Sequence, residues 1–194
     1  LLARRQAGIA ESYALLKAAQ DSLMAHVAVV DLQGVIVAVN DRWIEFAQDN
    51  AKEFGIDDPH TGVGMNYLAV CQASNDECSG SGAEIQQGIR DVLAGRLPSF
   101  QTVYPCHSPT ERRWFQMMVA PLKTARGGAV VSHTNITRLI LAEEALRESE
   151  QHYRTLADSE IALVWTSGLD MRCDYFNEPW LRFRGRALAE EIGE

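Results

Sequence analysis

Apolar and polar residues alternate along this chain with a period that changes several times, and each change predicts a new element. Helical spacing of apolar residues in 2–24 predicts an N-terminal amphipathic helix over residues 1–20. Further on, β-branched runs bounded by polar turns predict strands, and apolar residues three or four apart predict helices. The predicted strands span residues 27–30, 35–39, 99–107, 112–122 and 128–135, and the predicted helices between them span residues 41–52, 65–72 and 83–94.

This order of elements predicts an α+β domain over residues 21–137, built on a five-stranded antiparallel sheet with flanking short helices. The strand at 112–122 is apolar in both phases, with Trp114 and Met118 on one face and Phe115 and Met117 on the other. A sheet that is apolar on both faces has to be covered on both. We expect the domain's own helices on one face, and the N-terminal helix or a partner subunit on the other.

The next segment predicts a linker helix over residues 138–158. Its apolar and small residues fall on the a and d positions of three heptads, namely Leu139, Ala142, Leu146, Ser149, Tyr153 and Leu156. Glutamate and arginine side chains lie off this seam. We therefore expect a short coiled coil, and a homodimer held through the N-terminal and linker helices.

A repeated motif divides the chain further. The segment Asn40-Asp41-Arg42-Trp43-Ile44-Glu45-Phe46 reappears as Asn177-Glu178-Pro179-Trp180-Leu181-Arg182-Phe183, and Asp21-Ser22 reappears as Asp158-Ser159 with the same displacement. Residues 159–194 are therefore predicted to begin a second, truncated domain of the same kind. We expect the sequence, which runs from Leu1 to Glu194, to be a piece of a longer polypeptide.

Charge and composition narrow the classes of function. Eighteen Lys and Arg against 26 Asp and Glu give a net charge of −8. An acidic surface disfavours a general role on nucleic acid or on anionic membranes. The apolar runs fall far short of the roughly 20 residues of a membrane-spanning helix. The four cysteines form no secreted-type disulfide framework, which predicts a cytoplasmic location.

At this point the sequence resembles the PAS sensory family. Asn135-Ile136-Thr137 resembles the family's closing Asp-Ile-Thr, and the run from Ala142 to Glu150 resembles the usual linker between tandem PAS units. Tyr104-Pro105-Cys106-His107-Ser108-Pro109, followed by Arg113-Trp114-Phe115, is similar to a subgroup found in bacterial multidomain signalling proteins. The resemblance implies a PAS fold and a sensory input region that senses a small ligand or cofactor.

The same resemblance implies that a helical linker relays the signal to an output domain. We expect that domain to be a histidine kinase; the alternatives are a diguanylate cyclase or phosphodiesterase, or a ligand-free PAS dimerisation module. The residues offer no nucleophile motif and no phosphate-binding glycine loop, so we expect no enzymatic activity in this segment itself.

The resemblance also places the functional residues. PAS ligands usually sit against the last strands, which makes Tyr104, Trp114, Gln116 and Met118 the candidate ligand-binding residues. The sheet-to-linker connection makes Asn135, Ile136, Thr137, Leu139 and Leu146 the candidate relay residues. Trp43 and Trp180, which occupy the same place in the two repeats, are expected to be core anchors rather than ligand contacts.

Cofactors are disfavoured by specific positions. Tyr67 stands where a photoactive flavin-binding PAS domain carries its reactive cysteine, and Cys71 follows one helical turn later. This disfavours covalent flavin and leaves noncovalent flavin as an open alternative. The helix at 83–94 has no histidine to hold haem, and His60, His107 and His133 are expected on loops or strand edges. Cys71, Cys78 and the pair Cys106-His107 leave metal or redox sensing as a third alternative. Their spacing matches no common zinc site, so no metal is expected. Because haem and covalent flavin are also disfavoured, we expect no cofactor, although the residues do not identify what the domain binds.

Overall fold

The computed structural model describes residues 2–55, 61–73, 82–159 and 161–192. They fall into two units, Leu1–Arg138 and Leu139–Glu194, which are described separately. The first contains α1 (Leu2–Asp21), β1 (His26–Val30), β2 (Ile36–Val39), α2 (Asp41–Phe54), α3 (Tyr67–Ala73), α4 (Gly82–Leu93), β3 (Phe100–Pro105), β4 (Trp114–Pro121) and β5 (Ala129–Asn135). Helix α5 (Thr137–Ser159) leads into the second, which holds β6 (Trp165–Ser167), β7 (Cys173–Phe176), α6 (Glu178–Arg184) and α7 (Leu188–Glu191).

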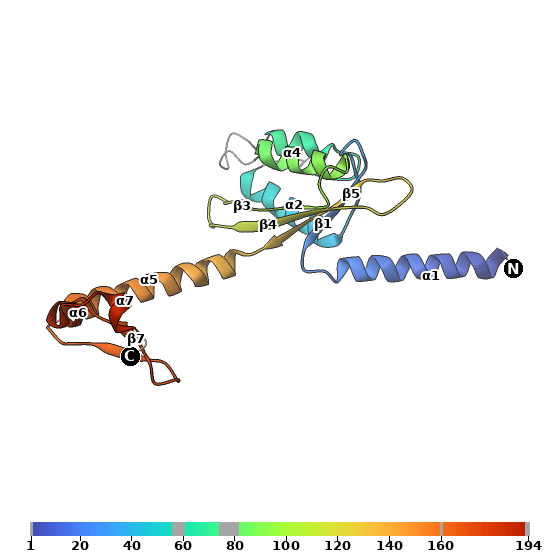
Figure 1. The fold of residues 1–194 in the computed structure, drawn as a ribbon. Helices are drawn as coiled ribbons and strands as arrows, with labels where there is room; N and C mark the ends of the chain where they lie inside the picture. The colour runs from blue at the N-terminus through green and yellow to red at the C-terminus, as the bar shows by residue number, and fades with distance from the viewer. Residues whose placement is uncertain (1, 56–60, 74–81, 160, 193–194) are drawn as a thin grey trace. The chain divides into compact units, whose positions relative to one another are not determined.

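The first unit is built on a five-stranded sheet in the order β2-β1-β5-β4-β3, and every neighbouring pair is antiparallel. This confirms the predicted α+β fold. Strands β1 and β5, the first and last of the unit, lie far apart in sequence but side by side in space (Figure 1). Strand β5 is therefore the central strand, with β1 and β4 on its two sides.

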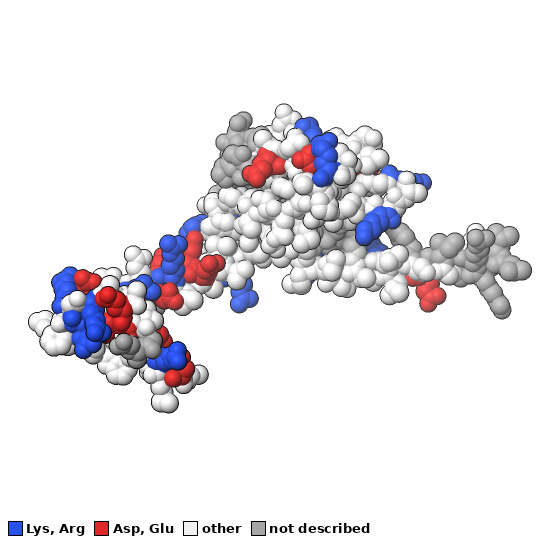
Figure 2. Space-filling model, viewed as in Figure 1, with Lys and Arg blue, Asp and Glu red and all other residues white. Residues whose placement is uncertain are grey.

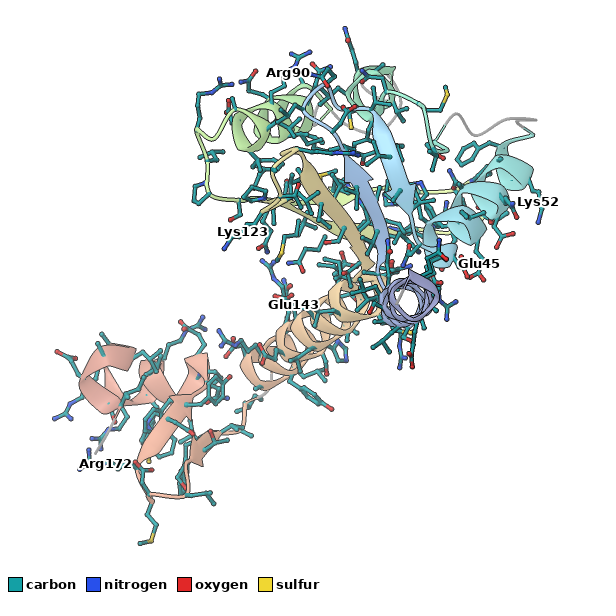
Figure 3. All side chains as sticks on the ribbon, turned by 90° about the vertical axis from the view of Figure 1, so that its right-hand side faces the viewer. Glu45, Lys52, Arg90, Lys123, Glu143 and Arg172 are labelled. Carbon is teal, nitrogen blue, oxygen red and sulfur yellow. The ribbon has the colours of Figure 1, made fainter. Side chains whose placement is uncertain are left out.

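The core lies on one face of this sheet, under helices that include α2 and α4 (Figure 1). Phe115, Met117 and Val119 of β4 point into it, each no more than 1% exposed. The labelled charged side chains of the covering helices, Lys52 on α2 and Arg90 on α4, lie at the surface (Figure 3). Polar outer sides and apolar inner sides on α2 and α4 follow from their helical spacing, which buries one stripe and leaves the rest in water.

Two helices differ in how they meet the expectations. Helix α1 forms as predicted, but its apolar and polar residues are balanced around the helix axis, so the prediction that it is amphipathic is wrong. Helix α5 presents its seam to solvent within the described residues, with Leu139, Leu146 and Tyr153 between 61% and 69% exposed. Charged side chains cover much of the rest of its surface (Figure 2). No helix in the described part of the chain combines the length and the apolar character needed to cross a bilayer.

The second unit repeats the opening of the first, strand for strand. Ala28 of β1 pairs with Val39 of β2, and at the equivalent positions of the second unit Trp165 of β6 pairs with Phe176 of β7. Both hairpins also carry an irregularity at the same step, between Val29 and Val30 in the first and at the equivalent place in the second. The repeat seen in the sequence is therefore a repeat of backbone pairing.

One residue of the second hairpin fits this shared backbone poorly. Gly34 has φ +80 in the first hairpin, and Met171, at the equivalent position, is held at φ +62. In each turn this residue's amide donates to a carbonyl three residues earlier, at 3.0 Å. A left-handed conformation costs a residue with a Cβ about 1–2 kcal/mol, while glycine adopts it freely.

We expect Met171→Gly to stabilise the second hairpin by about 0.5–1 kcal/mol, because the Met171 side chain is 88% exposed and contributes little packing. Amide hydrogen exchange at Gly168, whose N–H donates to the Arg172 carbonyl, should slow about two- to fivefold. The matched control is Leu169→Gly, an exposed neighbour without a positive φ, which should give no gain. Equal protection in the two variants would contradict the strain at Met171.

Candidate functional site

The core of the first unit contains a histidine on the central strand. Ala129, Val131 and His133 alternate along β5 and share its inward face, and His133 is 6% exposed. It lies between His26 of β1 and Met117 of β4 in the sheet register. The expectation that His133 lies on a loop or at a strand edge is therefore wrong, because the strand that carries it, β5, is paired with a strand on each side.

His133 bonds two tyrosines that come from distant parts of the chain. Its Nε2 lies 2.9 Å from the hydroxyl of Tyr67 at the start of α3, and its Nδ1 lies 2.7 Å from the hydroxyl of Tyr104 on β3. We call these three residues the tyrosine–histidine cluster. The Tyr67 hydroxyl also hydrogen-bonds the Cys71 thiol one helical turn along α3. The cluster thus ties the covering helix α3 to two strands of the sheet.

Burial fixes the charge state of this cluster. It lowers the pKa of His133 to about 3, so the imidazole is neutral at neutral pH. Burial also raises the pKa of the Tyr67 hydroxyl well above its usual value and that of the Cys71 thiol to about 11. A neutral imidazole has one N–H and one lone pair, so one tyrosine donates to His133 and the other accepts from it. The cluster is an uncharged chain of hydrogen bonds whose direction can reverse.

Aromatic rings surround the cluster. The ring of Trp43 lies 5.6 Å from that of Tyr67 and 5.5 Å from that of His133, and its indole N–H donates to the Thr61 carbonyl at 2.8 Å. Trp43 is 7% exposed, which confirms its prediction as a core anchor. On the other side, Tyr104 stacks on Phe115 at 6.1 Å between ring centres. The hydroxyls of the cluster therefore lie among closely packed aromatic rings.

The end of β5 is joined to the start of α5 through the first residue of β4. The backbone N–H of Trp114 donates to the Thr137 hydroxyl at 3.0 Å, and its carbonyl accepts from the Ile136 N–H at 2.9 Å. The Asn135 side chain accepts from the Thr137 N–H at 3.0 Å. We call these contacts the strand–helix junction. The structure thus brings three of the predicted relay residues together, while Leu139 and Leu146 lie farther along α5.

Residues 20–145 match the family described as the PAS fold. The chain belongs to the PAS family. PAS domains are sensory modules and not catalysts. The chain is also similar to an uncharacterized 104.1 kDa protein in the hypE 3' region of Rhodobacter capsulatus, with 46% identity over 141 residues. That match covers 70% of this chain but only 14% of the relative's length.

Several solved PAS structures are similar to this chain at low identity. The PAS domain of a Colwellia psychrerythraea protein is 18% identical, with a TM-score of 0.42, over 67% of this chain and 98% of its own. The PAS domain of an HTR-like protein from Haloarcula marismortui is 17% identical, with a TM-score of 0.44, over 69% of this chain and 98% of its own. The sensor region of a sensor histidine kinase is 17% identical, with a TM-score of 0.43, over 59% and 40% respectively.

The four ligand-binding residues predicted for this PAS unit do not share a face of the sheet. Tyr104 pairs with Phe115 and faces the core, where it belongs to the tyrosine–histidine cluster. Trp114, Gln116 and Met118 are in the opposite phase of β4 and lie on the outer face, where Met118 is 46% exposed. The pairing of β3 with β4 sets the phase of Tyr104, and no sequence period reveals that pairing. Ligand binding by these four residues stays a prediction.

The cysteines of the PAS unit lie in different surroundings. Cys71 is buried beside Tyr67, Cys106 is half-buried at the end of β3, and Cys78 lies outside the described residues. Within the described ranges, no three histidine, cysteine, aspartate or glutamate side chains gather as a metal site would require. Within the described core, the tyrosine–histidine cluster presents uncharged hydroxyls and a neutral imidazole.

Proposed function

We propose that this chain is the sensory input region of a bacterial signal-transduction protein. In this proposal the PAS unit responds to a small ligand or cofactor, and α5 carries the response to an output domain. We favour a histidine kinase as that output, with a diguanylate cyclase or phosphodiesterase as the alternative. In this chain the response would pass from the core of the PAS unit along β5 to α5, and one structural observation supports this path.

The supporting observation is that β5 carries both the tyrosine–histidine cluster and the strand–helix junction. His133 precedes Asn135 by two residues and therefore lies on the same strand within one pleat repeat of it. Asn135 pairs with Phe115, whose ring stacks on Tyr104. The preceding residue of β4, Trp114, hydrogen-bonds Thr137 at the start of α5. A ligand that alters the hydroxyls of Tyr104 or Tyr67 would shift β5 against β4, and so bias the start of α5.

The rest of the chain supports a serial arrangement. The exposed seam of α5 suits a homodimer, because burying Leu139, Leu146 and Tyr153 between two copies removes apolar surface from water. The backbone pairing repeated in 161–192 supports a second PAS-type unit beginning at 159. We therefore propose that α5 links two sensory units in the dimer. Dimerisation without any ligand, the alternative role, would use the same seam but would not need the junction.

Thr137→Val tests the relay directly. Valine keeps the volume of Thr137 but removes the oxygen that accepts from the Trp114 N–H, so it weakens the junction without opening a cavity. We expect it to change the rate at which Leu146→Cys forms an intermolecular disulfide in the dimer by about threefold or more, which corresponds to roughly 0.7 kcal/mol. The rate is read from non-reducing gels under mild oxidation, with Leu146→Cys in both proteins.

Two controls accompany this experiment. The protein without Leu146→Cys shows how much cross-linking the native cysteines contribute. Leu141→Cys, on the same helix but off the seam, should cross-link slowly whether or not Thr137 is replaced. An unchanged rate at Leu146→Cys, with a folded PAS unit, would contradict the relay and leave dimerisation alone as the role of α5. The absence of any intermolecular cross-link at this position would contradict the dimer as well.

A further inference from the structure

Two buried asparagines occupy equivalent positions in the two units and make the same contacts. The side chain of Asn40 is 0% exposed; its Nδ2 donates to the carbonyls of Gln20 at 3.3 Å and Ala25 at 2.9 Å. Its Oδ1 accepts from the N–H of Val27 at 2.9 Å and from that of Trp43 at 3.1 Å. The same amide thus reaches the end of α1, the turn that follows, the first strand and the start of α2.

Asn177 repeats every one of these contacts in the second unit. It too is 0% exposed, and its Nδ2 donates to the carbonyls of Ala157 at 2.7 Å and Ala162 at 2.8 Å. Its Oδ1 accepts from the N–H of Val164 at 3.0 Å and from that of Trp180 at 3.1 Å. We call each set of four contacts an asparagine clamp. The helix that Asn40 holds is α1, and the helix that Asn177 holds in the same way is α5.

An aspartate reinforces each clamp from the helix side. Asp21, at the end of α1, accepts from the backbone N–H of Asp41 at 3.1 Å. Asp158, near the end of α5, accepts from the backbone N–H of Glu178 at 2.8 Å. Each leading helix is therefore fastened to the next helix by a carboxylate as well as to the hairpin by an amide.

The chemistry of an amide makes these clamps directional. Its two N–H donors and its oxygen lie in one plane, so the carbonyls of the leading helix and the amides of the hairpin must keep a fixed mutual geometry. Because the side chain is fully buried, no water replaces a contact that is lost, and an unpaired group there is costly. The last turn of the leading helix cannot change direction without moving the first strand or breaking the clamp.

We propose that the asparagine clamp is the point at which each unit receives the orientation of the helix that leads into it. Helix α5 is then the outgoing helix of the first unit at the strand–helix junction and the incoming helix of the second at Asn177. Helix α1 is by the same contacts the incoming helix of the first unit at Asn40. This inference rests on the proposed relay through α5, and it adds the residues at which that relay is read.

Asn177→Asp isolates the part of the clamp that holds α5. Aspartate keeps the oxygen that accepts from Val164 and Trp180, but it loses both donors and faces the Ala157 and Ala162 carbonyls with a carboxylate oxygen. We expect the end of α5 to lose its fixed orientation to the β6–β7 hairpin. Residual dipolar couplings on the whole chain measure this: one alignment tensor fits both segments in the native protein, and that common fit is lost in the variant.

Asn40→Asp makes the same change in the first unit, where α1 should lose its common alignment with β1 and β2. This second variant keeps the test decisive if Asn177→Asp unfolds the second unit. The matched control is Asn66→Asp, an exposed asparagine whose Nδ2 donates to the Gln33 carbonyl but holds no leading helix. It should leave both helix orientations unchanged.

The two possible results separate the clamp from the relay. Loss of common alignment in Asn40→Asp or Asn177→Asp, with Val27 or Val164 still protected from hydrogen exchange, supports the clamp as the receiving point. A common alignment that survives both substitutions overturns the inference, because the helices would then be oriented by other contacts. The Thr137→Val cross-linking experiment is independent of either result, so a failed relay and a failed clamp are told apart.

Discussion

Replacing His133 by leucine should lower the free energy of unfolding of the PAS unit by about 3 kcal/mol at pH 7. Leucine fills much of the space but bonds neither hydroxyl, so the hydroxyls of Tyr67 and Tyr104 lose their imidazole partner inside the core. A buried polar group left without its partner costs about 1–3 kcal/mol. Tyr67 retains Cys71 as a weaker partner, which is why the expected loss is below the maximum for two hydroxyls.

The pH dependence of that loss identifies its origin. The pKa of His133 is about 3 in the folded protein, against an ordinary histidine value of 6.5, so between these two pH values the unfolded state binds more protons. The stability from the neutral, buried His133 is complete above pH 6.5 and falls as the pH drops, by up to about 1.4 kcal/mol per pH unit. The difference between native protein and His133→Leu should therefore shrink by about 2 kcal/mol from pH 7 to pH 5.

Urea unfolding of both proteins at the two pH values measures this difference. His26, whose pKa burial also lowers, is present in both proteins. Tyr67→Phe is the companion variant: it removes one hydroxyl, keeps His133 and should keep most of the native pH dependence. If His133→Leu costs the same at both pH values, the imidazole is not held neutral in the core and the description of the cluster is wrong.

Among the described glycines of the first unit, Gly128→Ala should be the most damaging replacement by alanine, lowering the free energy of unfolding by more than about 3 kcal/mol. Gly128 precedes β5 with φ +109, a conformation that residues with a Cβ rarely adopt. A Cβ there would also overlap the backbone carbonyl oxygen of Val30, which belongs to β1. A flexible side chain could swing aside, but this oxygen is fixed by the pairing of β1 with β5, so relief requires the central strands to separate.

Gly95→Ala is the matched control for this substitution. Gly95 has φ +70, but a Cβ there meets nothing within 4 Å. Gly95→Ala should therefore lower the free energy of unfolding only by the cost of the left-handed backbone conformation, about 1–2 kcal/mol. Urea unfolding or, for an unstable variant, the yield of soluble protein compares the two. An equal loss of unfolding free energy in both variants would mean that the positive φ alone determines the loss, and that the β1 backbone at Val30 can shift to accommodate the added methyl group.

Most elements of the fold could be predicted because their signals are local. Asn40 caps α2 by accepting from the Trp43 N–H, and Gly55 ends that helix in a left-handed conformation, so sequence neighbours fix both ends. The alternation on β4 likewise showed that Phe115 and Met117 share a face. These features depend on residues only a few positions apart, which a single sequence displays.

The candidate site could not be predicted to the same degree because it depends on pairing between distant strands. Tyr104 and His133 meet only because β3 and β5 both flank β4 in a particular register. Alternation of Ala129, Val131 and His133 along one strand was a usable signal that His133 faces inward. The phase of Tyr104 relative to Trp114 had no such signal, since either face of β3 could have met the core.

The equivalence of Asn40 and Asn177 also defines where this chain can be cut and rejoined. Because each clamp contact recurs at the equivalent position of the second unit, a chain in which Gln20 is followed directly by Asp158 retains an equivalent partner for every clamp contact. Helix α1 would then lead into the second hairpin with the helical phase unchanged. Recombination at this point adds or removes a whole sensory unit without disturbing a hydrogen bond of the clamp, so the clamp is a natural boundary for exchanging units between proteins.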